Sequence, residues 1–277
     1  MPALPTGELR RHAIGLLPAA AVCGAAVLLF GVQLVWPGFA LLAVVLVGAW
    51  LCDRSGRTER LAADLALIAL GQLIISTVSL KADLSNEGMV RFAVVLGLAV
   101  AVPFLVSRFL YREKVIRFPW RTGQRWTLAQ WGYLAAVVVA GWLILPFYFI
   151  TSGVYTNWPT VLTPDEIARL FVGVNAVGTW DELFFICTVF TLLRRHFPVW
   201  QANLLQATVF VSFLWELGYQ SWGPLLTIPF ALVQGWTFTL TKSLSYVLTV
   251  HLLFDAVVFA VIVYAHNGWP AIFLLAP

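Results

Sequence analysis

Five ionisable residues lie in stretches of this chain that are otherwise as apolar as lipid. They are Asp181, Glu182, Glu216, His251 and Asp255. An ionisable side chain at bilayer depth costs roughly 2.5–3.5 kcal/mol on insertion scales, so it usually faces a partner or a water-filled cavity. Because three neighbouring hydrophobic segments carry all five residues, we expect them to form one buried site.

The spacing of these residues indicates how a helix would present them. His251 and Asp255 are four residues apart, which places imidazole and carboxylate on one helix face. Such a carboxylate can orient the ring and select its tautomer, as catalytic and metal-binding histidines require. Asp181 and Glu182 are adjacent and would point about 100° apart on an α-helix. We therefore expect Glu182 to face His251 and Asp181 to point elsewhere, toward a Ser, Thr, Trp or backbone partner.

Each feature also has a purely structural interpretation. Asp181 and Glu182 would then be hydrogen-bonded structural acids, and His251 with Asp255 a mutually satisfied core pair. Glu216 precedes Gly218 near the end of its segment, where it would lie in the headgroup region. A further alternative is a metal site, because carboxylates and one imidazole can hold a divalent ion such as Zn, Mn or Fe. Its candidate ligands are Glu182, Glu216, His251 and Asp255.

The composition identifies the class of protein. Of the 277 residues, 61% are hydrophobic and 11% are charged, whereas soluble domains have about 45–50% apolar and 25% charged residues. The three cysteines are far apart and form no pattern for a disulfide framework or a zinc site. We therefore predict an all-α protein, a polytopic bundle of transmembrane helices.

The apolar runs predict nine helical spans. The first could be mistaken for a signal peptide, but it is about 20 residues long, enough to cross a membrane, and leads directly into a second run. The number of spans would be eight if residues 13–52 form one hairpin that does not fully cross the membrane. Thr163, Pro164 and Glu166 form a capping box that starts a helix of about 30 residues, which we expect to tilt, protrude or kink near Gly178. The predicted segments are a run that ends before Trp36, then 38–52, 61–80, 92–111, 128–150, 163–195, 198–217, 225–241 and 243–265.

The positive charges predict the orientation. With the N-terminus inside, 14 of the 17 Lys and Arg residues lie on the cytoplasmic side, and Lys81, Arg91 and Arg169 lie outside. The basic stretch 112–127 is then a cytoplasmic anchor, and we expect no nucleic-acid partner. We expect an integral protein of a bacterial plasma membrane with a cytoplasmic N-terminus.

The C-terminal half resembles the CAAX-protease and bacteriocin-processing family of intramembrane proteases. That family has the motifs EE-x-x-x-R, F-x-x-x-H and H-x-x-x-N or H-x-x-x-D on successive membrane helices. The similar stretches here are 181–186, 212–216 and 251–255, within a resemblance that covers roughly residues 165–262. We accordingly divide the chain into an N-terminal five-helix region of unassigned role, 1–150, and a catalytic-type membrane core, 151–277.

The resemblance implies an endopeptidase in which Glu182 activates a water that attacks a peptide bond within the membrane. His251, with Asp255, would steady the water or stabilise the oxyanion, and Asp181 and Glu216 complete the set of candidate catalytic residues. The expected partner is a membrane-associated protein or peptide as the substrate, or a lipid.

This chain departs from the family motifs at several positions. Asp181 replaces the first Glu, Ile186 replaces the Arg, and Ser212 and Glu216 occupy the second motif's Phe and His positions. Two alternatives to the protease therefore stay open. One is a non-catalytic relative that binds a peptide, a lipid or a partner protein in the same cavity. The other is different chemistry at the carboxylate and histidine metal site.

Overall fold

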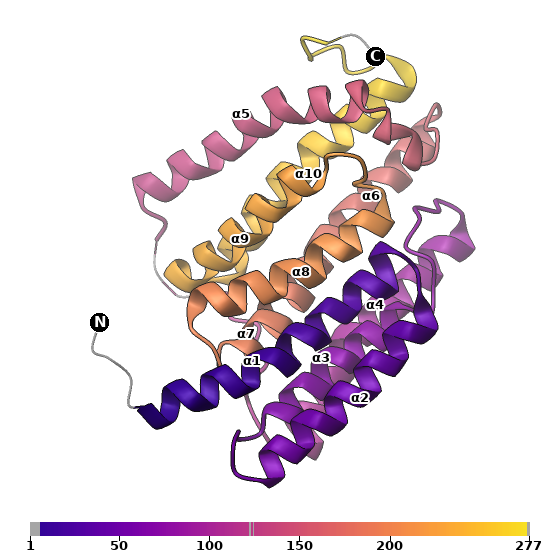
Figure 1. Cartoon of the computed structure of the whole chain (residues 1–277). Helices are drawn as coiled ribbons and strands as arrows, with labels where there is room; N and C mark the ends of the chain where they lie inside the picture. Colours follow the sequence, from indigo (N-terminus) through magenta and orange to yellow (C-terminus); the bar gives the residue numbers. More distant parts are fainter. Residues whose placement is uncertain (1–5, 122, 124, 276–277) are drawn as a thin grey trace.

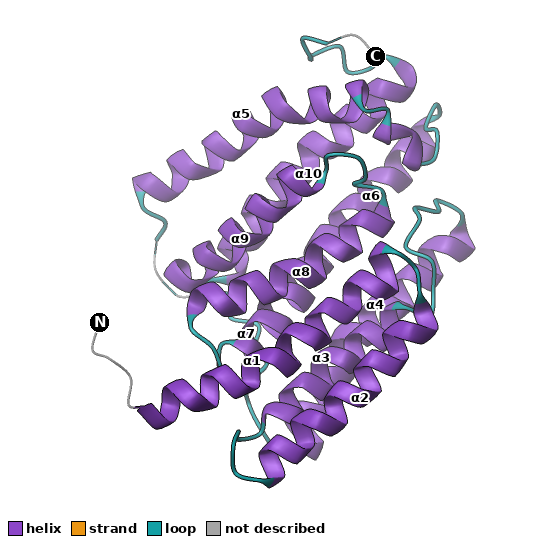
Figure 2. Cartoon of the chain, in the orientation of Figure 1, coloured by secondary structure: helices purple, strands orange, loops and turns teal. Residues whose placement is uncertain are grey.

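The structure is a computed structural model that describes residues 6–121, 123 and 125–275, with side chains from residue 14 onward. In this part of the chain every regular element is helical (Figures 1 and 2), which confirms the predicted all-α bundle. Arg10 and Arg11, two of the charges used for the orientation, lie outside the residues with described side chains. The predicted position of the N-terminus, residues 1–5, also lies outside the described residues.

Nine helical segments follow one another in the described chain, matching the predicted number. Some consist of more than one element because a π-helical stretch continues an α-helix. The segments are α1 (Thr6–Ala26) with η1 (Val27–Gly31), α2 (Val35–Arg54), α3 (Leu61–Ile75), α4 (Asn86–Leu105) with η2 (Val106–Leu110), α5 (Leu128–Thr151), α6 (Pro164–Asp181) with η4 (Glu182–Phe190) and α7 (Thr191–Leu193), α8 (Val199–Leu217), α9 (Pro224–Thr241) and α10 (Leu244–Asn267). A short 3-10 helix, η3 (Val154–Asn157), precedes α6.

Six segments within the described residues are long and apolar enough to cross a membrane, so the protein is a polytopic membrane protein. They are Ile14–Gly31, Val35–Arg54, Asn86–Leu110, Leu128–Thr151, Pro164–Leu193 and Leu244–Asn267. The first two are spans of 18 and 20 residues on separate helices, and each is long enough to cross on its own. Helices α3, α8 and α9 are also apolar but do not meet the same limits of length and hydropathy.

Two predicted boundaries are wrong. Helix α3 has 15 residues and not the 20 predicted, so it is about 22 Å long and shorter than a hydrocarbon core of about 30 Å. Its end is set by Ser76 and Thr77, whose hydroxyls donate to the carbonyls of Leu73 and Ile74. Helix α4 begins earlier than predicted because the Ser85 hydroxyl accepts a hydrogen bond from Gly88 N and caps it.

The helix that carries Asp181 and Glu182 lies in the middle of the bundle. Helices α1 to α4 pack together as neighbours, and α8 lies between α1 and α9. The α6–η4 helix contacts α4 on one side and α10 on the other, with α8 and α9 packed against η4. Helix α5 covers α10 from the far side (Figure 1). Helices on both sides of the predicted boundary at residue 150 thus pack against each other, and the division into 1–150 and 151–277 stays a prediction.

The central helix is 30 residues long, as predicted, but its interior is not uniformly α-helical. The capping box is present, with Glu166 Oε2 accepting from Thr163 N at 2.9 Å. From Glu182 to Phe190 the helix widens into a π-helix. The hydroxyls of Thr188 and Thr191 donate to carbonyls five residues back, at Leu183 and Ile186, as this wider turn allows.

An ionic network ties the N-terminal helices to the turn after α7. Asp64 on α3 is buried and accepts from Arg195 Nη1 at 3.0 Å and pairs with His196 Nε2 at 2.6 Å. Arg195 also contacts Glu113, which contacts Arg60. The Arg-rich turn therefore has a packing role in addition to its charge.

Candidate functional site

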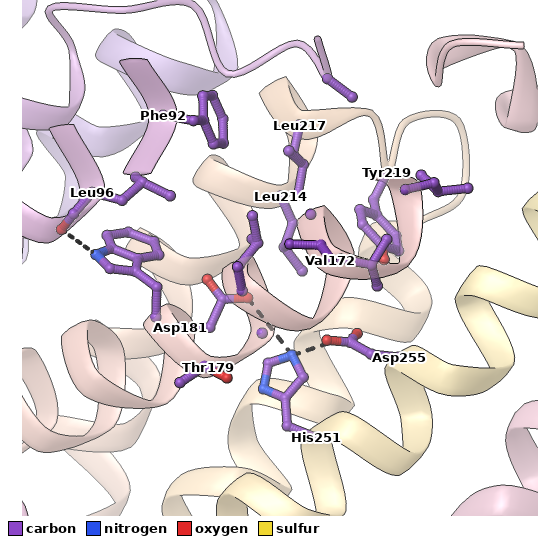
Figure 3. Close-up of a pocket in the computed structure, with 18 of the residues that line it drawn as sticks. Phe92, Leu96, Val172, Thr179, Asp181, Leu214, Leu217, Tyr219, His251 and Asp255 are labelled. Carbon is purple, nitrogen blue, oxygen red and sulfur yellow. Dashed lines mark hydrogen bonds and ion pairs between the residues drawn. The ribbon is translucent and has the colours of Figure 1, made fainter. Parts of the chain in front are cut away.

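His251 lies among three carboxylates from two helices. Its Nδ1 atom is 2.8 Å from Glu182 Oε1, and its Nε2 atom is 3.6 Å from Asp181 Oδ2 and 3.8 Å from Asp255 Oδ1. All four side chains are buried. Figure 3 shows Asp181 and Asp255 approaching the imidazole from α6 and α10. The structure thus confirms that Glu182 and His251 face each other, with Asp255 one turn further along α10.

The prediction that Asp181 points away from this site is wrong. Asp181 ends α6 and Glu182 begins η4, so the helix widens where the two acids meet the imidazole. One carboxylate reaches the Nε2 side of the ring and the other reaches the Nδ1 side. π-Helical turns are rare and frequently occur at functional sites. A calculation based on α-helical geometry could not place both acids at one ring.

A glycine on α6 makes room for Asp255. A Cβ atom built at Gly178 would collide with the Asp255 carboxylate, and it would lie 3.2 Å from His251 Cδ2. Only a residue without a side chain lets α6 and α10 approach this closely. Trp180, on the other side of α6, donates its indole N–H to the Leu96 carbonyl of α4 at 2.7 Å. Contacts on both sides of the helix therefore hold Asp181 in place.

A cavity of about 430 Å³ opens beside the imidazole. Asp181, His251 and Asp255 line it, whereas Glu182 is not among its lining residues and lies behind the ring. The rest of the lining is mostly apolar and comes largely from α4, α6, α8, α9, α10 and the loop before α4, with single residues from other elements. In that loop, Ala82, Asp83 and Leu84 line both the cavity and a surface recess near Arg169.

Glu216 does not join the cluster. Its Oε1 atom accepts a hydrogen bond from Leu80 N at 3.1 Å, and within the described chain the acids that contact His251 are Asp181, Glu182 and Asp255. Ser212, one turn before it, donates its hydroxyl to the Thr208 carbonyl. The expectation that Glu216 shares the site is therefore wrong.

A different row of α8 residues faces the cavity. Phe210, Leu214 and Leu217 follow the i, i+4, i+7 spacing of one helix face and line the cavity. Ser212 and Glu216 are not among the residues that line the cavity. If the second motif is placed two residues earlier, Phe210 stands at the motif's Phe and Leu214 at its His.

Several oxygen atoms of the cluster have no partner in the described protein. They are Asp181 Oδ1, Glu182 Oε2 and Asp255 Oδ2. A buried polar atom without a partner is costly. Two of these oxygens belong to residues that line the cavity, so a water or a substrate N–H group can supply the missing donors. The second oxygen of each aspartate, Asp181 Oδ2 or Asp255 Oδ1, lies 3.6 or 3.8 Å from His251 Nε2. Both distances exceed direct hydrogen-bond length, so these two oxygens can also bind a water.

The proposed metal ligands are only partly assembled. Glu182, His251 and Asp255 lie together, but Glu216 contacts Leu80, and the direct bond from Glu182 to His251 Nδ1 leaves no room for an ion between them. In the described part of the chain, no group of three or more His, Cys, Asp or Glu residues is arranged to hold a metal ion. A Zn, Mn or Fe ion stays a prediction.

One comparison with known proteins bears on these motifs. Residues 163–257 match the family model described as type II CAAX prenyl endopeptidase Rce1-like. No curated protein and no solved structure matches the chain significantly. The matched segment begins at the Thr163 cap and ends just after Asp255, so it contains the whole cluster around His251. Over this segment the chain is therefore similar to the Rce1-like family of CAAX prenyl endopeptidases.

Proposed function

We propose that this protein is an intramembrane endopeptidase in which Asp181, and not Glu182, activates the attacking water. The observation that carries the proposal is the cavity, because Asp181 and Asp255 line it on either side of His251 Nε2. A general base must lie within hydrogen-bond reach of the water whose proton it takes, so it must line the space that the water and substrate share. Glu182 lies behind the imidazole, where it orients the ring.

The proposed step needs only water and these side chains. A water held by Asp181 and His251 attacks the carbonyl carbon of the scissile peptide bond, and its proton passes to the Asp181 carboxylate. A C–O bond forms, and the tetrahedral intermediate collapses as the C–N bond breaks. Asp181 then returns the proton to the leaving amine nitrogen. His251 steadies the water with Nε2, and Asp255 restrains the imidazole from one turn away on α10.

The shape of the cavity supports a membrane-associated peptide as the substrate. Its walls are mostly apolar and come largely from membrane helices. Prenyl endopeptidases, the family described by the matching model, cleave peptides that carry a lipid. We propose a lipid-modified peptide whose apolar group lies against α4 and α8 while its peptide bond reaches Asp181.

A non-catalytic binding protein is the second candidate, and two positions favour it. Buried Ile186 occupies the place of the family's Arg, and cavity-lining Leu214 occupies the place of its second His. Neither side chain can donate a hydrogen bond to an oxyanion. On this reading the cavity would bind a peptide, a lipid or a partner protein without cleaving it.

Cleavage of a prenylated peptide by the purified protein in lipid vesicles distinguishes the candidates. With the reaction run in ¹⁸O-labelled water, an endopeptidase gives a new carboxylate that contains one labelled oxygen atom. The same peptide without its lipid should be cleaved more slowly. Tight binding of the prenylated peptide, with no product from a folded protein, would reject hydrolysis and support the second candidate.

A further inference from the structure

Gln234 on α9 is a buried polar residue in direct contact with the cluster, and the sequence gives it no role beyond helix packing. Its Nε2 atom lies 2.6 Å from Glu182 Oε1 and 3.1 Å from the Val247 carbonyl of α10. We infer that Gln234 is a positioning residue that acts through Glu182 to fix the orientation and tautomer of His251. This inference rests on the proposed function, because the imidazole must be oriented for catalysis.

The orientation of the Gln234 amide follows from its two partners. A main-chain carbonyl and a carboxylate oxygen both accept hydrogen bonds, so the NH₂ group and not the amide oxygen must face them. A flipped amide would set its oxygen against two other oxygens. Gln234 therefore donates to Glu182 and to α10 at the same time.

This contact constrains the position of Glu182 and, through it, the imidazole. Glu182 Oε1 receives the Gln234 amide and faces His251 Nδ1 at 2.8 Å. In the inferred arrangement Glu182 Oε1 accepts from both Gln234 and His251 Nδ1, so that Nε2 faces Asp181, Asp255 and the cavity. Gln234 on α9 therefore contacts Glu182, Glu182 contacts His251, and His251 lines the cavity.

The packing of α9 leaves the Gln234 side chain little freedom. Next to it, Gly235 lies so close to α8 that a Cβ atom there would collide with Asn203 Oδ1. Asn203 donates to the Leu232 carbonyl of α9 at 2.7 Å. Since α9 is held against α8 on this side, the adjacent residue is directed toward η4 and α10.

The variant Gln234→Met tests the role because Met has a similar shape but cannot donate. We expect kcat for the prenylated peptide to fall about 10–100-fold, the range seen when partners that orient a metal-bound histidine are removed. KM should hardly change, because Gln234 is not among the cavity-lining residues. The matched control is Gln206→Met: Gln206 is equally buried and bonds the Ala231 carbonyl of α9, away from the cluster. Its kcat should stay near the parent value.

A double variant separates positioning from packing. If Gln234 acts through Glu182, adding Gln234→Met to Glu182→Gln should lower kcat no further. Losses that multiply, or equal losses in Gln234→Met and Gln206→Met, would overturn the inference in favour of a packing role.

Histidine ¹⁵N NMR keeps the test independent of turnover. The chain has four His residues, and His251→Gln identifies the signal of interest. The parent should show a protonated Nδ1, and Gln234→Met should shift or broaden this signal while Gln206→Met leaves it unchanged. If the parent cleaves no peptide, the proposed function fails, and the NMR comparison still decides on Gln234. An unchanged His251 signal in Gln234→Met would reject the positioning role.

Discussion

Two adjacent acids have different surroundings at this site. Glu182 contacts His251 Nδ1 and Gln234, whereas Asp181 faces Nε2 and the cavity. The first arrangement orients a ring, and the second can take a proton from a water molecule. Their different roles follow from what each carboxylate touches, since the two residues are chemically alike.

Glu216 gives a residue-scale prediction that also tests the metal hypothesis. Glu216→Leu leaves the Leu80 amide without its acceptor, so we expect a loss of about 1–3 kcal/mol in the free energy of unfolding. The specific activity of the folded variant and its metal content should equal those of the parent, because Glu216 does not contact the cluster. Thermal unfolding in detergent and elemental analysis measure both effects.

Glu216→Gln is the control, because its amide oxygen can still accept from Leu80 and stability should be near the parent value. If the parent protein contains a divalent ion and both Glu216 variants lose it, this result would support the predicted metal site with Glu216 as one of its four ligands.

The sequence was informative where the residue type itself is costly. A charge in an apolar helix needs a partner, and this reasoning identified Asp181, Glu182, His251 and Asp255. It also included Glu216, which finds its partner elsewhere, at the Leu80 amide. It could not find Gln234 or Leu214. An uncharged Gln in a membrane helix usually makes an interhelical hydrogen bond, and a Leu there has no distinguishing feature. Their importance follows from the directions of their side chains.

At the scale of helices, the site depends on close contact between the central helix and α10. The π-helical stretch from Glu182 to Phe190 turns two successive acids toward one ring. Gly178 lets α10 approach α6, which brings Asp255 to the cavity. Changes in either feature should move the carboxylates without altering their chemistry.

Gly178→Ala tests the helix contact. Its methyl group would collide with Asp255 and must push α6 and α10 apart. A misplacement of about 1 Å can cost about 100-fold in rate, so we expect kcat to fall by this order. The peptide cleavage assay measures kcat, and thermal unfolding in detergent reports the accompanying loss of stability.

Gly173→Ala, on the same helix, is the matched control, because the nearest atom to its Cβ position lies 4.0 Å away. Replacing a mid-helix Gly by Ala gains about 0.5–1 kcal/mol, so this variant should be active and slightly more stable. Equal activity of the two variants would contradict the role given to the α6–α10 contact.

The number and order of helices could be predicted from hydrophobic runs, and the Thr163 cap from its residues. The ends of α3 and the start of α4 could not, because local hydroxyl contacts at Ser76, Thr77 and Ser85 set them. The π-helix was also not predictable. Hydrophobic periodicity does not resolve the small change in residues per turn that distinguishes a π-helix from an α-helix.

At the scale of the whole molecule, the N-terminal helices pack against the segment that matches the family model, residues 163–257. Helix α1 packs on α8, and α4 packs on the central helix and contributes to the cavity wall. The Asp64 network adds a polar link at the Arg-rich turn. Helices outside residues 163–257 therefore help to form the cavity, and α4 contributes directly to its shape.

The orientation in the membrane is a prediction at this scale. We propose a bacterial plasma membrane protein with residues 112–127 in the cytoplasm and residues 76–85 on the outer side, because of the distribution of Lys and Arg. Reporters fused within each loop should be active only in the matching compartment. Because α3 is short, the reporter at 76–85 is the critical one. A cytoplasmic signal from this reporter would show that α3 does not cross the membrane, and the predicted number of spans would then be wrong.

The central claim is that Asp181 activates the water, and the turnover of Asp181→Asn tests it most directly. Asn keeps the size and one acceptor oxygen but cannot take the proton, so kcat should fall by about 10²–10⁴-fold, the contribution of general-base catalysis. KM and the unfolding temperature should stay near the parent values. Cleavage of the prenylated peptide by Asp181→Asn at the parent rate would contradict the account, and loss of turnover in Glu182→Gln alone would return the base to Glu182.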